Sequence, residues 1–199
     1  MSRDLELSVF NTPLGWFALA GTCGRILWCT QGHPSRAAAE RHARASLAGN
    51  VALRDWHAEA RRRLTAFAAG AHVTFDDLPL DLDGVPAFHR AVLAACRRIG
   101  YGRTMTYAQL ARAAGRPRAV RAAGTAMARN PLPIIIPCHR VVRSDGGLGG
   151  YSAPQGVSLK ARLLELEAAA VNSRTDTGPA RSPRRRGHAV RGVQSRRTA

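Results

Sequence analysis

Cys138 is the residue of this sequence whose type and neighbours best suit chemistry. It follows the apolar run 134–136 and Pro137, and it precedes His139 and Arg140. A nearby cation lowers the pKa of a thiol and raises the fraction of thiolate, which is the nucleophilic form. The apolar run predicts a short buried strand, and neighbouring residues of a strand point to opposite faces. Contact between Cys138 and His139 therefore requires a departure from strand geometry, which Pro137 favours, or a bridging water.

The other cysteines favour a structural interpretation. Cys23, Cys29 and Cys96 fall on predicted apolar strand or helix faces, and burial is the commoner fate of a free cysteine. The same structural role is the alternative for Cys138. Four scattered cysteines are too few for a disulfide scaffold, which indicates a reducing cytoplasm. Cys23 and Cys29 with His33 make a poor ligand set, so we expect no metal site.

Several helices are predicted to position this cysteine. One spans 86–100. Thr106, followed three residues later by Gln109, forms a capping box that opens a helix through Ala114, which Gly115 closes. The next helix begins at Pro117 and ends near Arg129, and the pair forms a helix-turn-helix pattern. The second helix is rich in alanine and arginine. Its small residues either allow close approach to another surface or pack inside the domain.

The remaining sequence divides into three parts. Residues 1–83 predict a small α/β scaffold, with strands in 5–30, two helices in 35–70 and a further strand from the alternating Leu78, Leu80 and Leu82. A boundary at Gly84 begins a mostly helical domain over 84–171, whose last helix covers about 158–170. Residues 172–199 carry eight arginines against one acid, which predicts a disordered basic tail.

The segment 130–142, Asn-Pro-Leu-Pro-Ile-Ile-Ile-Pro-Cys-His-Arg-Val-Val, resembles the signature of the alkylguanine-DNA alkyltransferases, also called methylated-DNA–protein-cysteine methyltransferases. The resemblance extends from about Phe88 to Glu167. The first 80 or so residues agree only in outline, through Thr12-Pro13-Leu14-Gly15, and the resemblance implies a ribonuclease-H-like sheet there. The loop 153–156 reads Ala-Pro-Gln-Gly where many members have a glycine run, which leaves the tolerated alkyl size open.

The resemblance implies direct DNA repair. The alkyl group of 6-O-methylguanine in double-stranded DNA moves irreversibly and once per molecule to Cys138, without a cofactor; 4-O-methylthymine stays open as a second substrate. The damaged nucleotide rotates out of the stack while the second helix of the pair lies in the minor groove. The resemblance further implies a monomer, with clustering along DNA left open, and a cytoplasmic protein associated with the nucleoid when bound.

The resemblance also assigns roles to single residues. His139 acts through a water as base for Cys138, and Glu167 orients that histidine. Tyr107 pushes on the phosphate backbone and later donates to the guanine ring, while Arg121 replaces the rotated base. Ala122 and Asn130 belong to the DNA-binding part, where Asn130 braces the turn. The base pocket is implied to include Val141, Tyr151, Ser152 and Met127. From the sequence alone, Glu167 is a surface carboxylate and Arg121 a phosphate-binding or solvated arginine.

Composition agrees with a folded protein and a polyanionic partner. The chain of 199 residues is 45% hydrophobic with a net charge of +17, and all but one of its 30 basic residues are arginine. Such charge attracts nucleic acid, although a compositional bias without any partner would look the same. No apolar run approaches the ~20 residues of a membrane span. Two other functions stay open: a DNA-binding protein without chemistry, and a Cys-His hydrolase.

Overall fold

A computed structural model describes residues 4–175 of the chain. Its strands are β1 (Asp4–Thr12), β2 (Gly15–Thr22), β3 (Arg25–His33), β4 (Asn50–Leu53), β5 (Met105–Thr106) and β6 (Val141–Val142). Its helices are α1 (Arg36–Ser46), α2 (Ala58–Ala68), α3 (Ala87–Arg97), α4 (Tyr107–Ala113), α5 (Val120–Ala128) and α6 (Gly156–Thr175), with a 3-10 helix, η1 (Cys138–Arg140).

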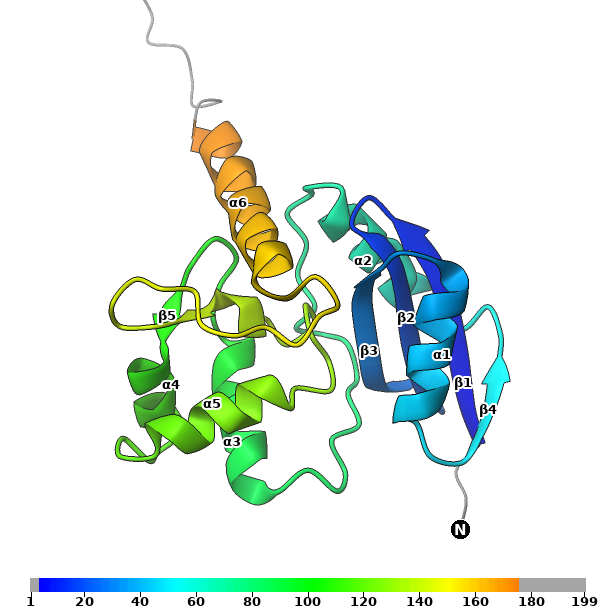
Figure 1. Cartoon of the computed structure of the whole chain (residues 1–199), viewed down its shortest axis with the longest axis horizontal. Helices are drawn as coiled ribbons and strands as arrows, with labels where there is room; N and C mark the ends of the chain where they lie inside the picture. Colours follow the sequence, from blue (N-terminus) through cyan, green and yellow to red (C-terminus); the bar gives the residue numbers. More distant parts are fainter. Residues whose placement is uncertain (1–3, 176–199) are drawn as a thin grey trace, which may run out of the picture.

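The N-terminal part is a mixed sheet between two helices (Figure 1). The strand order is β3-β2-β1-β4; the first three strands pair antiparallel, and β4 pairs parallel with β1. Side chains alternate between the faces of a strand. Leu7 and Ala18 therefore pack toward α1 with Ala39, while Phe17 and Leu19 pack on the opposite side with Phe67 of α2.

The C-terminal part consists of helices around a short parallel ladder. Helices α3, α4 and α5 contact one another, and Figure 1 shows them beside the sheet with α6 rising next to them. The ladder pairs Met105 with Val141 and Thr106 with Val142. It ties the start of α4 to the residues that follow η1.

One core joins the two parts. The largest cluster of buried apolar side chains includes Leu19 and Phe67 from the N-terminal part and Val92, Ile136 and Leu163 from the C-terminal part. The predicted boundary at residue 84 stays a prediction. No helix in 4–175 combines the length and apolarity needed to cross a bilayer.

Most predicted helices are confirmed, including the capping box. Thr106 Oγ1 accepts a hydrogen bond from the backbone N–H of Gln109, and Gln109 Oε1 accepts one from the backbone N–H of Thr106. Glycine 115, at φ +79°, follows the helix as expected. The helix predicted from Pro117 begins three residues later, at Val120, because 117–119 complete the turn.

Three other predictions are wrong. The alternating leucines of 78–82 form no strand; only Leu80 makes a bridge, to Ile26. In this loop Leu78 is buried, whereas Leu80 and Leu82 are half-buried against the core. The run 134–136 is buried but forms a tight turn, closed by a hydrogen bond from the Ile136 amide to the Leu132 carbonyl (2.7 Å). Helix α6 continues to Thr175, so residues 172–175 are helical; the rest of the predicted tail, 176–199, lies outside the described residues. Strand β4 was not predicted.

Candidate active site

The short ladder brings Tyr107 and Cys138 to one place. Tyr107 is the first residue of α4, directly after β5, and Cys138 opens η1, directly before β6. Because β5 pairs in register with β6, the two side chains approach from neighbouring segments. The departure from strand geometry that the sequence required is present, as the 3-10 turn 138–140.

Asn130 holds the turn that leads to Cys138. Its Nδ2 donates to the Ile136 carbonyl (2.8 Å), and its Oδ1 accepts from the Leu132 amide (3.0 Å). The turn contains Ile134 at φ +71°, a conformation that a β-branched residue rarely adopts. Both functional groups of one amide therefore stabilise a strained turn. The predicted bracing role of Asn130 agrees with this geometry.

A pocket of about 350 Å³ opens at Cys138. Its volume lies within the usual range for small-molecule sites, about 300–1,000 Å³. The residues that line it are Tyr107, Gly124, Met127, Ala128, Cys138, Gly150, Tyr151 and Ser152. Gly149 lies close to the Tyr107 side chain. It has φ +71°, and a Cβ at this position would lie 3.0 Å from the Tyr107 hydroxyl.

His139 lies against a buried carboxylate. Its Nε2 and Glu167 Oε1 are 2.8 Å apart, and both side chains are almost fully buried. Arg140 donates to Glu167 from Nε and Nη2, and the Gly102 amide donates to Oε2 at 2.9 Å. Burial raises the pKa of Glu167, but hydrogen bonds from His139 and Arg140 outweigh it and hold that pKa at about 2. The carboxylate is therefore ionised at neutral pH.

The ionised Glu167 fixes the tautomer of His139. Burial lowers the pKa of this histidine, so its ring is neutral at pH 7. Since the carboxylate can only accept, the single ring proton lies on Nε2, and Nδ1 keeps a free lone pair. Within the described residues, Nδ1 has no hydrogen-bond partner. The ring of Phe67, from the N-terminal part, packs 6.0 Å from the imidazole, centroid to centroid.

The pKa of the Cys138 thiol is not lowered in the way that its sequence neighbours predicted. Burial raises its pKa, while a hydrogen bond from Asn130 and the charge of Lys160 oppose that shift. Arg140 points to Glu167 and the Ile99 carbonyl instead. The prediction of a pKa lowered by adjacent cations is wrong, because burial outweighs every nearby charge. At rest, the group is a thiol.

Lys160 is a site residue that sequence reasoning missed. It is fully buried on α6, seven residues before Glu167, so both point the same way after two turns. Its Nζ donates to the carbonyls of Val141 (2.6 Å) and Leu148, and it lies 5.9 Å from the centre of the Tyr107 ring. The only lysine of the chain, placed among leucines at helical spacing, was a signal that could have found it.

Other predicted residues lie at different depths. Val141 is fully buried and is not among the residues that line the pocket. Ser152 donates its hydroxyl to the Ala128 carbonyl at 3.1 Å. Arg121 and Ala122 lie exposed on α5, outside the pocket. Cys29 and Cys96 are buried as expected, whereas Cys23 is exposed, because it lies in the turn between β2 and β3.

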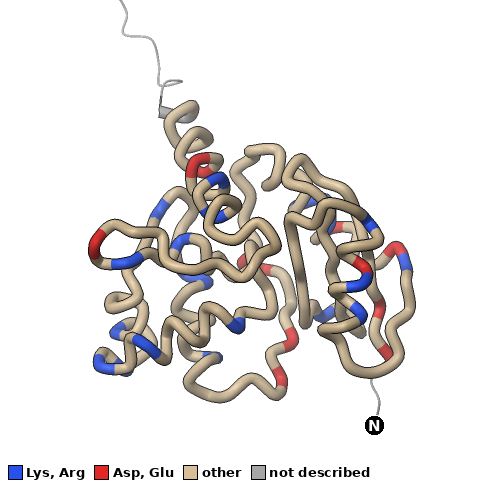
Figure 2. Tube along the Cα trace, viewed as in Figure 1, with Lys and Arg blue, Asp and Glu red and all other residues tan. Residues whose placement is uncertain are grey.

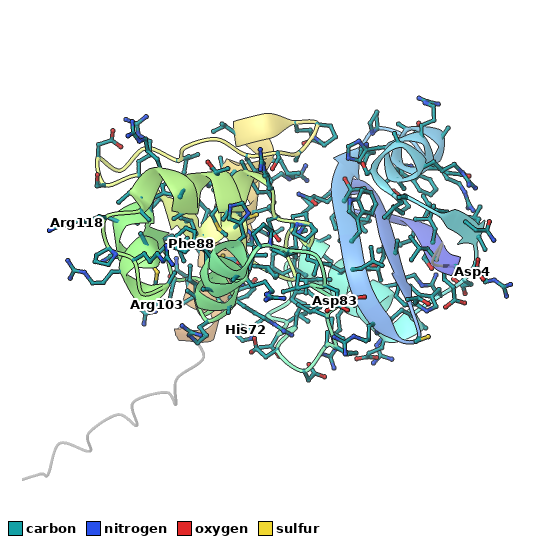
Figure 3. All side chains as sticks on the ribbon, turned by 90° about the horizontal axis from the view of Figure 1, so that it is seen from below. Asp4, His72, Asp83, Phe88, Arg103 and Arg118 are labelled. Atoms are coloured by element: carbon teal, nitrogen blue, oxygen red, sulfur yellow. The ribbon has the colours of Figure 1, made fainter. Side chains whose placement is uncertain are left out.

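Positive charge gathers around α4 and α5 (Figure 2), whereas most acidic positions lie on the sheet side and in the loop before α3. Figure 3 shows Arg118 at the outer edge of the helices, at the other end of the molecule from Asp4. The exposed face beside the pocket is therefore suited to a polyanion. Among residues 4–175, no three His, Cys, Asp or Glu side chains gather to hold a metal ion.

These features define a class: a two-part protein with a small mixed sheet, a helical C-terminal part and a pocket cysteine beside a buried His–Glu pair. Residues 87–169 match the family model of the 6-O-methylguanine DNA methyltransferase, DNA binding domain. Since a solved O6-methylguanine methyltransferase is 32% identical to this chain and is covered to 94% by it, the chain belongs to this methyltransferase family.

Related proteins agree with that assignment. The chain is 51% identical over 102 residues to the methylated-DNA–protein-cysteine methyltransferase of Methanothermobacter thermautotrophicus. This aligned region covers 51% of the chain and 55% of the relative. It is 46% identical over 110 residues to the constitutive one of Bacillus subtilis, covering 55% and 65%. The aligned part thus spans about half of the first relative and under two thirds of the second.

Solved structures cover more of the chain. The crystal structure of the Mycobacterium tuberculosis O6-methylguanine methyltransferase is 32% identical, with a TM-score of 0.69, and the match covers 83% of this chain and 94% of that one. A structure of Mycobacterium tuberculosis OGT in complex with DNA matches with the same coverages, 32% identity and a TM-score of 0.68. The likeness includes the N-terminal part.

Proposed function

We propose that this protein repairs DNA by moving the alkyl group of 6-O-alkylguanine onto Cys138. The observation that carries the proposal is a pocket of about 350 Å³ lined by Cys138, whose neighbour in the sequence, His139, is a buried, neutral histidine bound to the ionised Glu167. The names of the related proteins, methylated-DNA–protein-cysteine methyltransferases, and the complex of a similar protein with DNA support the substrate class.

The reaction begins with a thiol and therefore needs a base. Nδ1 of neutral His139 takes the Cys138 proton through a water, and ionised Glu167 stabilises the imidazolium that results. The sulfur attacks the alkyl carbon, forming an S–C bond as the C–O bond breaks. The released electron pair goes to the guanine oxygen.

The guanine must then be neutralised. Because the Ser152 hydroxyl donates to Ala128, its backbone N–H is the donor that we assign to the developing oxyanion. Tyr107 is protonated at the start, since burial raises its pKa, and it transfers that proton to a nitrogen of the guanine ring. The proton that His139 took from Cys138 then returns to the Tyr107 oxygen, which leaves the guanine, the tyrosine and the histidine neutral. The thioether that remains on Cys138 is stable, so each molecule reacts once.

The same proposal covers the DNA contact and the finer description of the fold. Helices α4 and α5 form a helix-turn-helix whose second helix lies in the minor groove, with Arg121 filling the space of the rotated base. Asn130 connects this helix to the turn before Cys138. The N-terminal sheet is of the ribonuclease-H type. The protein acts as a monomer at a single lesion.

A labelled-methyl transfer assay tests the proposal. With duplex DNA that carries labelled 6-O-methylguanine, we expect one label per protein molecule. Cys138→Ala abolishes transfer and retains DNA binding, whereas Cys29→Ala, a matched change at another buried cysteine, keeps transfer. Binding without transfer by the wild-type protein would indicate a DNA-binding protein without chemistry, and neither binding nor transfer would favour a hydrolase.

A further inference from the structure

The N-terminal sheet contacts the wall of the Cys138 pocket. Gln31, near the end of β3, donates from Nε2 to the Tyr151 hydroxyl at 3.0 Å. Gln155 donates to the carbonyl of the adjacent Gly32, also at 3.0 Å. The two hydrogen bonds span 120 and 123 residues of the chain. Two consecutive residues of one strand thus hold both ends of the segment 151–155.

The end of β3 is shaped for this contact. Gln31 is 2% exposed; burying an amide is unfavourable unless it forms hydrogen bonds, and within the described residues only its Nε2 has a partner, the Tyr151 hydroxyl, while its Oε1 has none. Gly32 has φ +74°, and a Cβ there would lie 2.8 Å from Leu159 Cδ2 and 3.4 Å from Gln155 Nε2. A side chain at position 32 would therefore push the start of α6 and the segment 151–155 away from the strand.

The segment 151–155 lies outside the helices and strands. Ser152 attaches one side of it to α5 through the Ala128 carbonyl. The Tyr151 side chain, which lines the pocket together with Cys138, has its hydroxyl held by Gln31. The position of the Tyr151 ring thus depends on a residue that lies far from the reactive cysteine in the sequence.

We propose that Gln31 is a positioning residue that determines the size of the alkyl group the pocket accepts. The inference rests on the proposed alkyl transfer. The transferred carbon must touch the Cys138 sulfur, so the rest of a large alkyl group must fit against the neighbouring wall, to which Tyr151 belongs. A methyl group needs little of that wall. A benzyl group needs the wall to be fixed and correctly placed.

The test compares two free guanine bases, one with a methyl and one with a benzyl group on the exocyclic oxygen. Each rate is separated into a binding constant and a maximal rate of Cys138 alkylation. Gln31→Met has a similar shape but cannot donate. We expect it to slow benzyl transfer by about threefold to tenfold, the range for one lost hydrogen bond, and to leave methyl transfer nearly unchanged. The ratio of the benzyl transfer rate to the methyl transfer rate is unaffected by any inactive protein, because both rates come from one preparation.

Two comparisons separate positioning from general stability. Thr30→Val removes another buried hydrogen bond of β3, to His33 at 2.8 Å, and should leave the benzyl-to-methyl ratio unchanged. In a Tyr151→Phe background, Gln31→Met should no longer change that ratio. An unchanged ratio in Gln31→Met, or an equal change in Thr30→Val, overturns the proposal while alkyl transfer stands. If the wild-type protein accepts neither base nor methylated duplex DNA, the proposed function fails and takes this inference with it.

Discussion

The two sides of the Cys138 pocket are built in opposite ways. On the inner side, His139, Glu167 and Arg140 are buried, and both oxygens of the carboxylate accept hydrogen bonds. On the outer side, α5 presents Arg121 to solvent, and its guanidinium has no hydrogen bond or ion pair within residues 4–175. The charged groups of the inner side are thus paired within the protein, whereas the Arg121 guanidinium on the outer side is left for the proposed contact with DNA. We therefore expect the proposed chemistry and the proposed DNA contact to be disrupted by separate substitutions.

The largest effect is expected on the inner side. His139→Gln removes the base and should slow alkylation by about 10²- to 10⁴-fold at pH 7, for duplex DNA and free base alike. The wild-type rate should stay level from neutral into mildly acidic pH, because burial lowers the pKa of His139. In the variant, the rate should rise with pH beyond 9, because burial raises the pKa of the Cys138 thiol. Single-turnover rates across pH measure both profiles.

A matched change keeps this test specific. His42→Gln alters an exposed histidine of α1 and should leave rate and profile unchanged. A loss of the same size at every pH in His139→Gln would contradict the role of a base.

Glu167→Gln should mainly reduce stability. The carboxylate pKa is about 2 in the folded protein against 4.5 as the ordinary value, so the ionised form stabilises the fold above pH 4.5, and this contribution is lost as pH falls toward 2. Leaving Arg140 buried without its partner is expected to lower the free energy of unfolding by about 3–5 kcal/mol. Denaturant unfolding at pH 7 and pH 3 measures the free energy of unfolding of both proteins. The difference in this free energy between variant and wild type should be smaller at pH 3. A difference independent of pH would contradict the assignment of that pKa.

Arg121→Ala should have the smallest effect, and it tests the role of the solvent-facing outer side of the pocket. Base rotation costs a few kcal/mol, so without Arg121 we expect repair of duplex DNA to slow by about tenfold, with reaction of a free alkylguanine base unchanged. Arg129→Ala, an exposed arginine just after α5, is the matched control for lost charge. Equal losses on duplex and free base would remove the proposed role of Arg121.

The sequence predicted the parts of the site that lie on local patterns. The capping box at Thr106, the helices around it and the region of Cys138 followed from residues a few positions apart. The strand predictions at 78–82 and 134–136 were wrong, because apolar spacing reports burial and not whether a neighbouring strand is available to pair. The short β4 was missed because its pairing with β1 is long-range.

Side-chain partners were harder to predict than elements. The contact of Arg140 with Glu167 reversed the expected role of the arginine, since a buried carboxylate attracts the cation more strongly than a neutral thiol does. Lys160 could have been found from its apolar neighbours. Nothing local marks Gln31 or Phe67, whose contacts with Tyr151 and His139 depend on how the sheet packs on the helices.

The central claim is tested most directly by mass spectrometry of the intact protein after incubation with duplex DNA that contains 6-O-methylguanine. The account predicts a single increase of about 14 Da, one methyl group in place of the thiol proton, on the peptide that contains Cys138. An unchanged mass, or a methyl group mapped to Cys23, Cys29 or Cys96, would contradict it.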